Sequence, residues 1–244
     1  RLKVPLVLHE GNAYPSQVNR WLASSAALVI VAQEQALKHL PRARRTLTIP
    51  FPVRERRAER RTARESFGLA QDAVVTLVMG GSQGSATLNR VAPDAFAQLA
   101  TRFPWLEVVH SAGHGNAGLV PDVRPHAARY HVVEFVDAAQ AWAAADLAIT
   151  RAGVGTLSEA AYNGVPLVMV PLPSSAEDHQ LHNARAVAEA GAGVVVEESD
   201  LDALVPAWES LLDPATRATA AAAAAARTPV GAARRILDAV MELT

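Results

Sequence analysis

Short apolar runs that alternate with helical patterns constrain the fold of this chain more than any other feature. The best defined runs are Val74–Met79, Leu106–His110, Asp146–Thr150 and Leu167–Val170, with helical patterns in between. Uninterrupted apolar strands that are each followed by a helix are typical of a parallel sheet covered on both faces. The pattern therefore predicts an α/β protein of the doubly wound type.

A basic segment divides this pattern into two units. The stretch from Arg42 to Arg64 is rich in arginine and contains Pro50 and Pro52, which predicts a linker followed by a polar helix. The chain begins with Arg1 rather than Met and reaches a strand almost at once, so we expect only the C-terminal half of the first unit. The predicted parts are a remnant of a first Rossmann-like domain (1–52), a basic linker (53–69), a second Rossmann-like domain (70–226) and a C-terminal helix that packs back on the first domain (227–244).

Composition excludes several classes of protein. Half of the 244 residues are hydrophobic and 19% are charged, so the chain can bury a substantial core. The absence of cysteine excludes a disulfide scaffold, a thiolate metal site and a cysteine nucleophile. A net charge of −1 gives no support for coating of nucleic acid. No apolar run is long enough to cross a bilayer.

Ligands of open α/β sheets bind beyond the carboxyl ends of the strands, so the segments that follow strands are the candidate sites. Gly80–Gly84 follows one strand and precedes a helix. Glycines let backbone N–H groups approach an anion, and a helix N-terminus favours negative charge. The segment matches neither a Walker A loop nor a complete G-x-G-x-x-G motif. It is therefore either an anion cradle or an ordinary tight turn.

The segment Arg151–Thr156 forms a second glycine-bearing junction after a strand. The spacing of Thr156 and Glu159 fits a capping box, in which the two side chains satisfy backbone donors. Alternatively, Glu159 accepts hydrogen bonds from a ribose, as acidic residues do in other nucleotide-binding folds. Arg151 is either a cation near a phosphate or one half of an ion pair.

Polar residues also follow two further strands. Asp178, His179 and Gln180 open a helix and together could donate to and accept from several sugar hydroxyls, although Asp178 could simply be a helix N-terminal acid. One His with one Asp is too few for a metal site. His9, at the end of the first strand, is either a general base or a histidine bonded within a turn.

The arginines and tryptophans each allow a structural interpretation. The arginine-rich segment could form ion pairs with Glu55, Glu59 and Glu65, or it could contact an anionic lipid or a phosphate. The tryptophans have no spacing typical of a stacking platform, so we expect core or surface anchors; they are Trp21, Trp105, Trp142 and Trp208.

Taken together and in order, these segments resemble the MurG family of bacterial UDP-N-acetylglucosamine (UDP-GlcNAc) transferases, which complete lipid II and have a two-domain GT-B fold. The resemblance covers almost the whole chain. The matching segments are His9–Ala13 with Asn19 and Arg20, Pro52–Arg54, Gly80–Gly84 with Leu88 and Asn89, Glu134–Asp137, Ala145–Leu147, Arg151–Glu159, and Pro171–Gln180 with Asn183 and Ala184.

The resemblance implies a role for each candidate residue. It places Asn12 and Arg54 near the donor across a cleft, with His9 and Glu10 as the catalytic residues beside the acceptor. It implies that UDP-GlcNAc contacts the following residues: Gly80, Gly81, Ser82, Gln83, Gly84 and Arg151 around the diphosphate, the backbone of Phe135 and Val136 at the uracil, Val154, Gly155, Thr156, Leu157 and Ser158 around the nucleotide, Glu159 at the ribose, and Asp178, His179 and Gln180 at the GlcNAc hydroxyls.

The implied activity is an inverting transfer of GlcNAc to the C4 hydroxyl of the MurNAc unit of lipid I, for peptidoglycan synthesis. No cofactor, metal ligand or nucleic acid is expected, and the expected location is the cytoplasmic face of the inner membrane, in contact with its anionic surface. The family usually has Gln where Gly11 stands and Asn where Phe51 stands. Its first glycine-rich loop, which ends in a His, is absent, so we expect this chain alone to bind donor weakly and to fail in turnover.

Two alternatives remain open from the sequence. One is a different UDP-sugar enzyme of the same architecture, such as a glycolipid-forming galactosyl- or glucosyltransferase or a UDP-GlcNAc 2-epimerase. The other is a non-catalytic UDP-sugar-binding half that works only with a partner chain.

Overall fold

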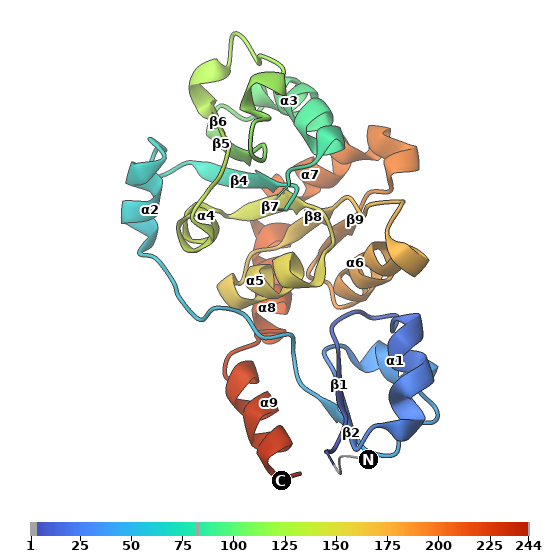
Figure 1. Ribbon diagram of the computed structural model, residues 1–244. Coiled ribbons are helices and arrows are strands. Elements are labelled where there is room, and N and C mark those ends of the chain that lie inside the picture. Colours follow the sequence, from blue (N-terminus) through green and yellow to red (C-terminus); the bar gives the residue numbers. More distant parts are fainter. Residues whose placement is uncertain (1–3, 82, 244) are drawn as a thin grey trace.

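The computed structural model describes residues 4–81 and 83–243, which form two units, each built on a parallel sheet (Figure 1). The larger unit has six strands in the order β6-β5-β4-β7-β8-β9. They are β4 (Val74–Met79), β5 (Leu106–Ser111), β6 (Tyr130–Val133), β7 (Leu147–Thr150), β8 (Leu167–Met169) and β9 (Gly193–Val195). Strand order reverses between β4 and β7, and this switch point is where open α/β sheets bind ligands.

Helices cover both faces of the six-stranded sheet. Apolar residues of one face pack against α2 (Arg60–Ser66), α4 (Ala138–Ala144), α5 (Val154–Asn163) and α6 (His179–Glu189). Those of the other face pack against α3 (Ala86–Ala100) and α7 (Leu204–Leu212), while α8 (Pro214–Ala226) contributes to both cores. The short 3₁₀ helices of this unit are η3 (Ala117–Leu119), η4 (Ala127–Arg129), η5 (Ala176–Asp178) and η6 (Glu198–Ala203).

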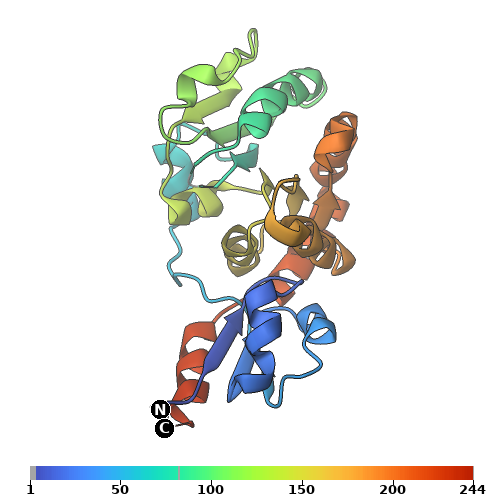
Figure 2. The same cartoon turned by 45° about the vertical axis from the view of Figure 1, so that its right-hand side comes forward.

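The smaller unit also has two covered faces, although its sheet contains just β1 (Val7–Glu10), β2 (Leu28–Val31) and β3 (Thr46–Thr48) within the described residues. One face packs against residues around η1 (Ala23–Ser25) and η2 (Glu34–His39), beside α1 (Gln17–Leu22). The other face packs against α9 (Ala232–Met241), the last helix of the chain. The chain therefore crosses between the units twice, and α9 lies beside the smaller sheet (Figure 2). The predicted fold class, with two units of Rossmann type, is confirmed.

Two local features refine the pattern of the sequence. Glu34–His39 is helical, as a 3₁₀ helix rather than an α-helix. The helix after β7 begins at Val154 with Gly153 as its N-cap residue, so Thr156 and Glu159 lie inside the helix and away from its cap.

The arginine-rich linker is fixed to the larger unit. Arg64 is fully buried, pairs with Asp146 at 2.7 Å and donates to the carbonyls of Ala144 and Ala73. Arg60 pairs with the same aspartate at 2.5 Å. The predicted partners of the arginines were mostly wrong, because Glu55 accepts from the backbone of Gly231 and Glu59 caps α2, while Glu65 does pair with Arg61.

Across residues 4–81 and 83–243, no helix has both the length and the apolar character needed to span a bilayer.

Candidate functional site at the switch point of the larger sheet

The glycine turn after β4 is pressed against the loop after β5. Gly84 has φ +73, and a Cβ at this position would lie 2.0 Å from the carbonyl oxygen of Ala112. Only glycine fits this close approach. Ser85 then caps α3 by accepting from the backbone of Leu88. Ser82, which the sequence predicted to face the diphosphate, lies outside the described residues.

The N-terminus of α5 lies beside this turn across a hollow of about 520 Å³. The hollow is lined by Gly80, Gly81, Gln83, Gly84, Arg151, Gly153, Thr156 and Gln180, among others. Among the residues that the structure describes, no side chain caps α5, and a Cβ at Gly155 would meet no other group within 4 Å. The first backbone N–H groups of a helix lack intrahelical partners, so they can bind an anion. The expected capping box of Thr156 and Glu159 is therefore absent from α5.

Gln180 presents a donor to the same hollow. Its side-chain Oε1 accepts from the backbone N–H of Ala152 at 3.0 Å and of Leu172 at 3.1 Å. These two bonds fix the amide orientation and leave Nε2 to donate to a ligand. Of the three residues predicted to read the sugar, Gln180 is the one that lines the hollow.

Arg151 takes part in an ion pair. Its guanidinium lies 2.5 Å from Oε1 of Glu198 and donates to the carbonyl oxygen of Val170 at 3.0 Å. The side chain is nearly buried although it lines the hollow. Its charge is therefore already neutralised within the protein, as one of the two sequence interpretations expected.

Glu159 and Arg54 line a neighbouring pocket of about 170 Å³, together with Trp142 and Tyr162. The indole Nε1 of Trp142 donates to Oε2 of Glu159 at 2.9 Å, which holds the carboxylate in one orientation. Arg54 is exposed, and within residues 4–81 and 83–243 no carboxylate pairs with it. The pocket thus combines an oriented acceptor with a cation that has no internal partner.

The other residues predicted to contact the donor do not lie in one place. Phe135 has a side chain that is 71% exposed, whereas Val136 is buried in the core. Val154, Leu157 and Ser158 line a different cavity, of about 460 Å³, which lies between the two units. Asp178 lines a fourth hollow, beside Pro173 and Ser199.

His9 is stacked on Phe51, with ring centroids 5.5 Å apart and an interplanar angle of 21°. Partial burial lowers the pKa of His9 below its usual 6.5, against the opposing effect of the Glu10 carboxylate. A Cβ at Gly11 would lie 2.9 Å from the Phe51 ring. The two departures from the family pattern are therefore complementary, because Phe51 fills space that a side chain at position 11 would need.

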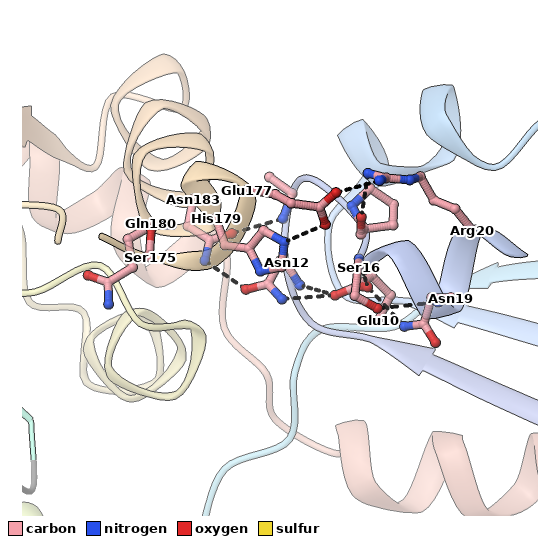
Figure 3. A network of polar contacts seen from close by, with 12 residues as sticks. Glu10, Asn12, Ser16, Asn19, Arg20, Ser175, Glu177, His179, Gln180 and Asn183 are labelled. Carbon is pink, nitrogen blue, oxygen red and sulfur yellow. Dashed lines mark hydrogen bonds and ion pairs between the residues drawn. The ribbon is translucent and has the colours of Figure 1, made fainter. Parts of the chain in front are cut away.

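Glu10 builds the loop that follows β1 (Figure 3). Its buried carboxylate accepts from the backbone N–H groups of Asn12 and Ser16, at 2.9 and 2.8 Å, and from the side-chain amides of Asn12 and Asn19. Both oxygens are thus occupied by neutral donors. These contacts hold Asn12 in place, and the catalytic role that the resemblance implied for Glu10 stays a prediction.

Asn183 joins this loop to the larger unit, and sequence reasoning gave it no role. It is 1% exposed, accepts from the backbone N–H of Ala13 at 2.8 Å and donates to Oδ1 of Asn12 at 3.0 Å. Its place three residues after Gln180 was the available signal, because that spacing puts both side chains on one face of a helix. Trp142 was likewise expected only to anchor the core or the surface, and its bond to Glu159 was not predicted.

Among the described residues, no group of three or more His, Asp or Glu side chains is assembled so that it could hold a metal ion.

Comparisons with known proteins point to one family. A model of the glycosyltransferase family 28 C-terminal domain matches residues 75–236. A Deinococcus deserti protein named UDP-N-acetylglucosamine–N-acetylmuramyl-(pentapeptide) pyrophosphoryl-undecaprenol N-acetylglucosamine transferase is 43% identical over 97% of this chain and 68% of its own length. A Deinococcus radiodurans protein of the same name is 39% identical over 97% of this chain and 66% of its own length.

A solved structure gives the same result. The crystal structure of Acinetobacter baumannii MurG matches with a TM-score of 0.80 and 29% identity, over 99% of this chain and 67% of that chain. The present chain therefore spans about two thirds of the length of these relatives.

Proposed function

Because this chain belongs to glycosyltransferase family 28, we propose that it transfers GlcNAc from UDP-GlcNAc to lipid I, the undecaprenyl-linked acceptor that becomes lipid II. The observation that carries the proposal is the meeting of the uncapped N-terminus of α5 with the glycine turn at the switch point of the sheet. Both features line one hollow, and the first backbone N–H groups of α5 lack intrahelical partners, which suits the diphosphate of a nucleotide sugar.

The proposed donor position assigns roles to residues of the hollow and of the neighbouring pocket. The diphosphate lies between Gly80–Gly84 and the first turn of α5, and Arg54 neutralises part of its charge. Glu159, oriented by Trp142, accepts hydrogen bonds from the ribose hydroxyls. Nε2 of Gln180 donates to a hydroxyl of GlcNAc, since its Oε1 is already occupied.

The proposed reaction is a direct displacement at the anomeric carbon of GlcNAc. The C4 hydroxyl of the lipid I MurNAc attacks C1 from the face opposite UDP, the bond from C1 to the diphosphate oxygen breaks, and the product is a β1→4 link. Negative charge grows on the leaving diphosphate, so preorganised N–H donors stabilise the transition state. Removal of one such donor typically slows catalysis by about 10²–10³.

His9 is the proposed base for the proton of the attacking hydroxyl. A base must be neutral before it accepts a proton, and the lowered pKa keeps the His9 ring neutral at pH 7. Glu10 supports the reaction indirectly, by holding Asn12 in the loop next to His9.

Titration with UDP-GlcNAc, UDP-glucose and UDP-galactose tests the donor, and incubation of the full-length protein with lipid I or a soluble analogue tests transfer. We expect the tightest binding for UDP-GlcNAc and a β-linked product. Tighter binding of another UDP-sugar would favour a different enzyme of the same architecture. A product that retains the α-configuration would contradict the displacement.

We also propose that the protein works at the cytoplasmic face of the membrane, where a lipid-linked acceptor meets a water-soluble donor. Val18, Trp21 and Leu22 lie on one face of α1 and are 59%, 69% and 40% exposed. Arg42 and Arg44 are also exposed, and such a combination suits an anionic lipid surface. We expect flotation with anionic vesicles, and a loss of flotation in Trp21→Ala. Equal flotation with neutral vesicles would contradict a role for the anionic surface.

A further inference from the structure

The loop between β8 and α6 contains a backbone conformation that its residues seldom adopt. Glu177 and Asp178 are consecutive and have φ values of 51° and 54°, in the left-handed region. A side chain makes this region unfavourable because Cβ approaches the carbonyl oxygen. Residues of this kind persist where surrounding contacts hold them, and they cluster at functional sites. The contacts of Glu177 therefore decide whether the loop keeps its shape.

The contact that holds Glu177 comes from the other unit (Figure 3). Arg20, on α1, pairs with one carboxylate oxygen of Glu177, and Nε2 of His179 lies 3.4 Å from the other oxygen. Arg20 is itself fixed, because it donates to the carbonyl oxygen of Pro15 at 3.0 Å and lies 4.8 Å from the centre of the Tyr14 ring. The hydrogen bond from Arg20 lowers the pKa of Glu177, so this carboxylate is charged at neutral pH.

The shape of this loop also fixes Gln180. Leu172, near the start of the loop, donates its backbone N–H to Oε1 of Gln180, and Ser175 Oγ accepts from the backbone N–H of Gln180 at 3.3 Å. The left-handed residues Glu177 and Asp178 stand between Ser175 and Gln180. If they relaxed to the right-handed region, Leu172 and Ser175 would be displaced relative to Gln180, and the Gln180 amide would lose the bond from Leu172, one of the two that orient it.

We propose that Arg20 is a positioning residue for the donor sugar: through Glu177 it holds the left-handed turn that keeps the Gln180 amide directed at the hollow beside the glycine turn. The inference rests on the proposed function, in which that hollow receives GlcNAc. The proposal also means that the smaller unit, which carries His9, sets the affinity for the sugar of the donor through Arg20. UDP alone lacks the group that Gln180 reads, so its binding is independent of Arg20.

Calorimetric titration of Arg20→Gln with UDP-GlcNAc and with UDP separates an effect on binding of the sugar from an effect on binding of the nucleotide. We expect UDP-GlcNAc to bind about fivefold more weakly, with the affinity for UDP unchanged. Unchanged affinity for UDP also shows that the variant is folded. The matched control is Arg45→Gln, because Arg45 likewise joins the smaller sheet unit to a distant segment, through an ion pair of 2.8 Å with Glu242. It should change neither affinity.

A pair of substitutions at Glu177 tests the role of the backbone. Glu177→Ala removes the ion pair and keeps a Cβ in the left-handed region, whereas Glu177→Gly removes both the ion pair and the unfavourable Cβ. We expect Glu177→Gly to bind UDP-GlcNAc more tightly than Glu177→Ala does. Equal losses in these variants, or an Arg20→Gln variant that matches Arg45→Gln, would overturn the inference alone. Failure of the unaltered chain to bind UDP-GlcNAc would overturn the proposed function as well.

Discussion

The indole Nε1 of Trp142 donates a hydrogen bond of 2.9 Å to Oε2 of Glu159, which joins the core of the larger unit to its candidate nucleotide pocket. Trp142 is 2% exposed on α4, and Glu159 is partly exposed on α5. One carboxylate oxygen is thus held from inside the protein, and the other is available to a ligand. A carboxylate fixed in this way suits a diol, which offers two hydroxyl donors at a set spacing.

Removal of the Glu159 carboxylate should therefore weaken binding of UDP and UDP-GlcNAc alike. For Glu159→Ala we expect about a tenfold loss for both ligands, the size typical of a hydrogen bond to a charged group. Trp142→Phe keeps the apolar ring and removes the orienting bond, so its loss should be smaller. Trp208→Phe is the matched control, because Trp208 is equally buried and donates to Thr76 Oγ1 at 2.9 Å, within the core. Unchanged UDP affinity in Glu159→Ala would remove Glu159 from the site.

The larger sheet was predictable because its strands are buried on both faces. Such strands are continuously apolar, and the predicted Val74–Met79 coincides with β4. Prediction was weaker where local preference competes with packing. The segment Glu34–His39 has a helical pattern, yet it forms a 3₁₀ helix against the smaller sheet. No pattern within that segment distinguishes the two kinds of helix.

The site was predictable as an edge of the sheet, and less so as a set of side chains. Sequence order places Gly80, Gly81, Gly84, Thr156 and Gln180 after neighbouring strands, and they line one hollow. Sequence order does not show which face of α5 each residue occupies. It therefore could not predict that Val154 and Ser158 line a different cavity. The partners of Arg151 and Glu10 come from segments whose approach depends on tertiary packing, and these partners determine what each charge can do.

Arg54 should contribute to binding through its charge, because no carboxylate of the described residues pairs with it. We expect Arg54→Gln to weaken UDP-GlcNAc binding by about tenfold and to reduce the dependence of the affinity on salt. Calorimetry at low and high salt measures both effects. Arg61→Gln is the control, since Arg61 pairs with Glu65 at 3.1 Å on the same basic segment. A similar loss in both variants would indicate a general effect of net charge.

The contact between His9 and Phe51 should set the pH at which His9 becomes neutral. Burial lowers the pKa of His9 below 6.5, so an NMR titration of its ring should give a midpoint on the acid side of that value. Because a base acts in its neutral form, the rate of transfer by the full-length protein should fall as the pH drops through this midpoint. Phe51→Ala should return the pKa toward 6.5 and move the fall in rate to higher pH. An unchanged midpoint would show that Phe51 does not control the titration.

His110 lies at the centre of a buried polar network in the larger unit. Its Nδ1 lies 2.8 Å from the hydroxyl oxygen of Tyr130, and its Nε2 lies 3.0 Å from Oδ1 of Asn89. Asn89 in turn donates to the carbonyl oxygen of Ala112, the atom that Gly84 approaches closely. The network therefore links the core to the glycine turn, and protonation of His110 affects both.

Burial lowers the pKa of His110 to about 4, which predicts a loss of stability in mild acid. The unfolded chain binds a proton on this histidine near pH 6.5, whereas the folded chain binds it near pH 4, so the unfolded state holds more protons between these values. Stability should be complete above pH 6.5 and should decrease as the pH falls toward 4. From pH 7.5 to pH 5 the free energy of unfolding should drop by about 2 kcal/mol on this account. Urea unfolding at both pH values measures the drop, and His110→Gln, which cannot take up the proton, should reduce it. An equal drop in that variant would assign the acid sensitivity to other groups.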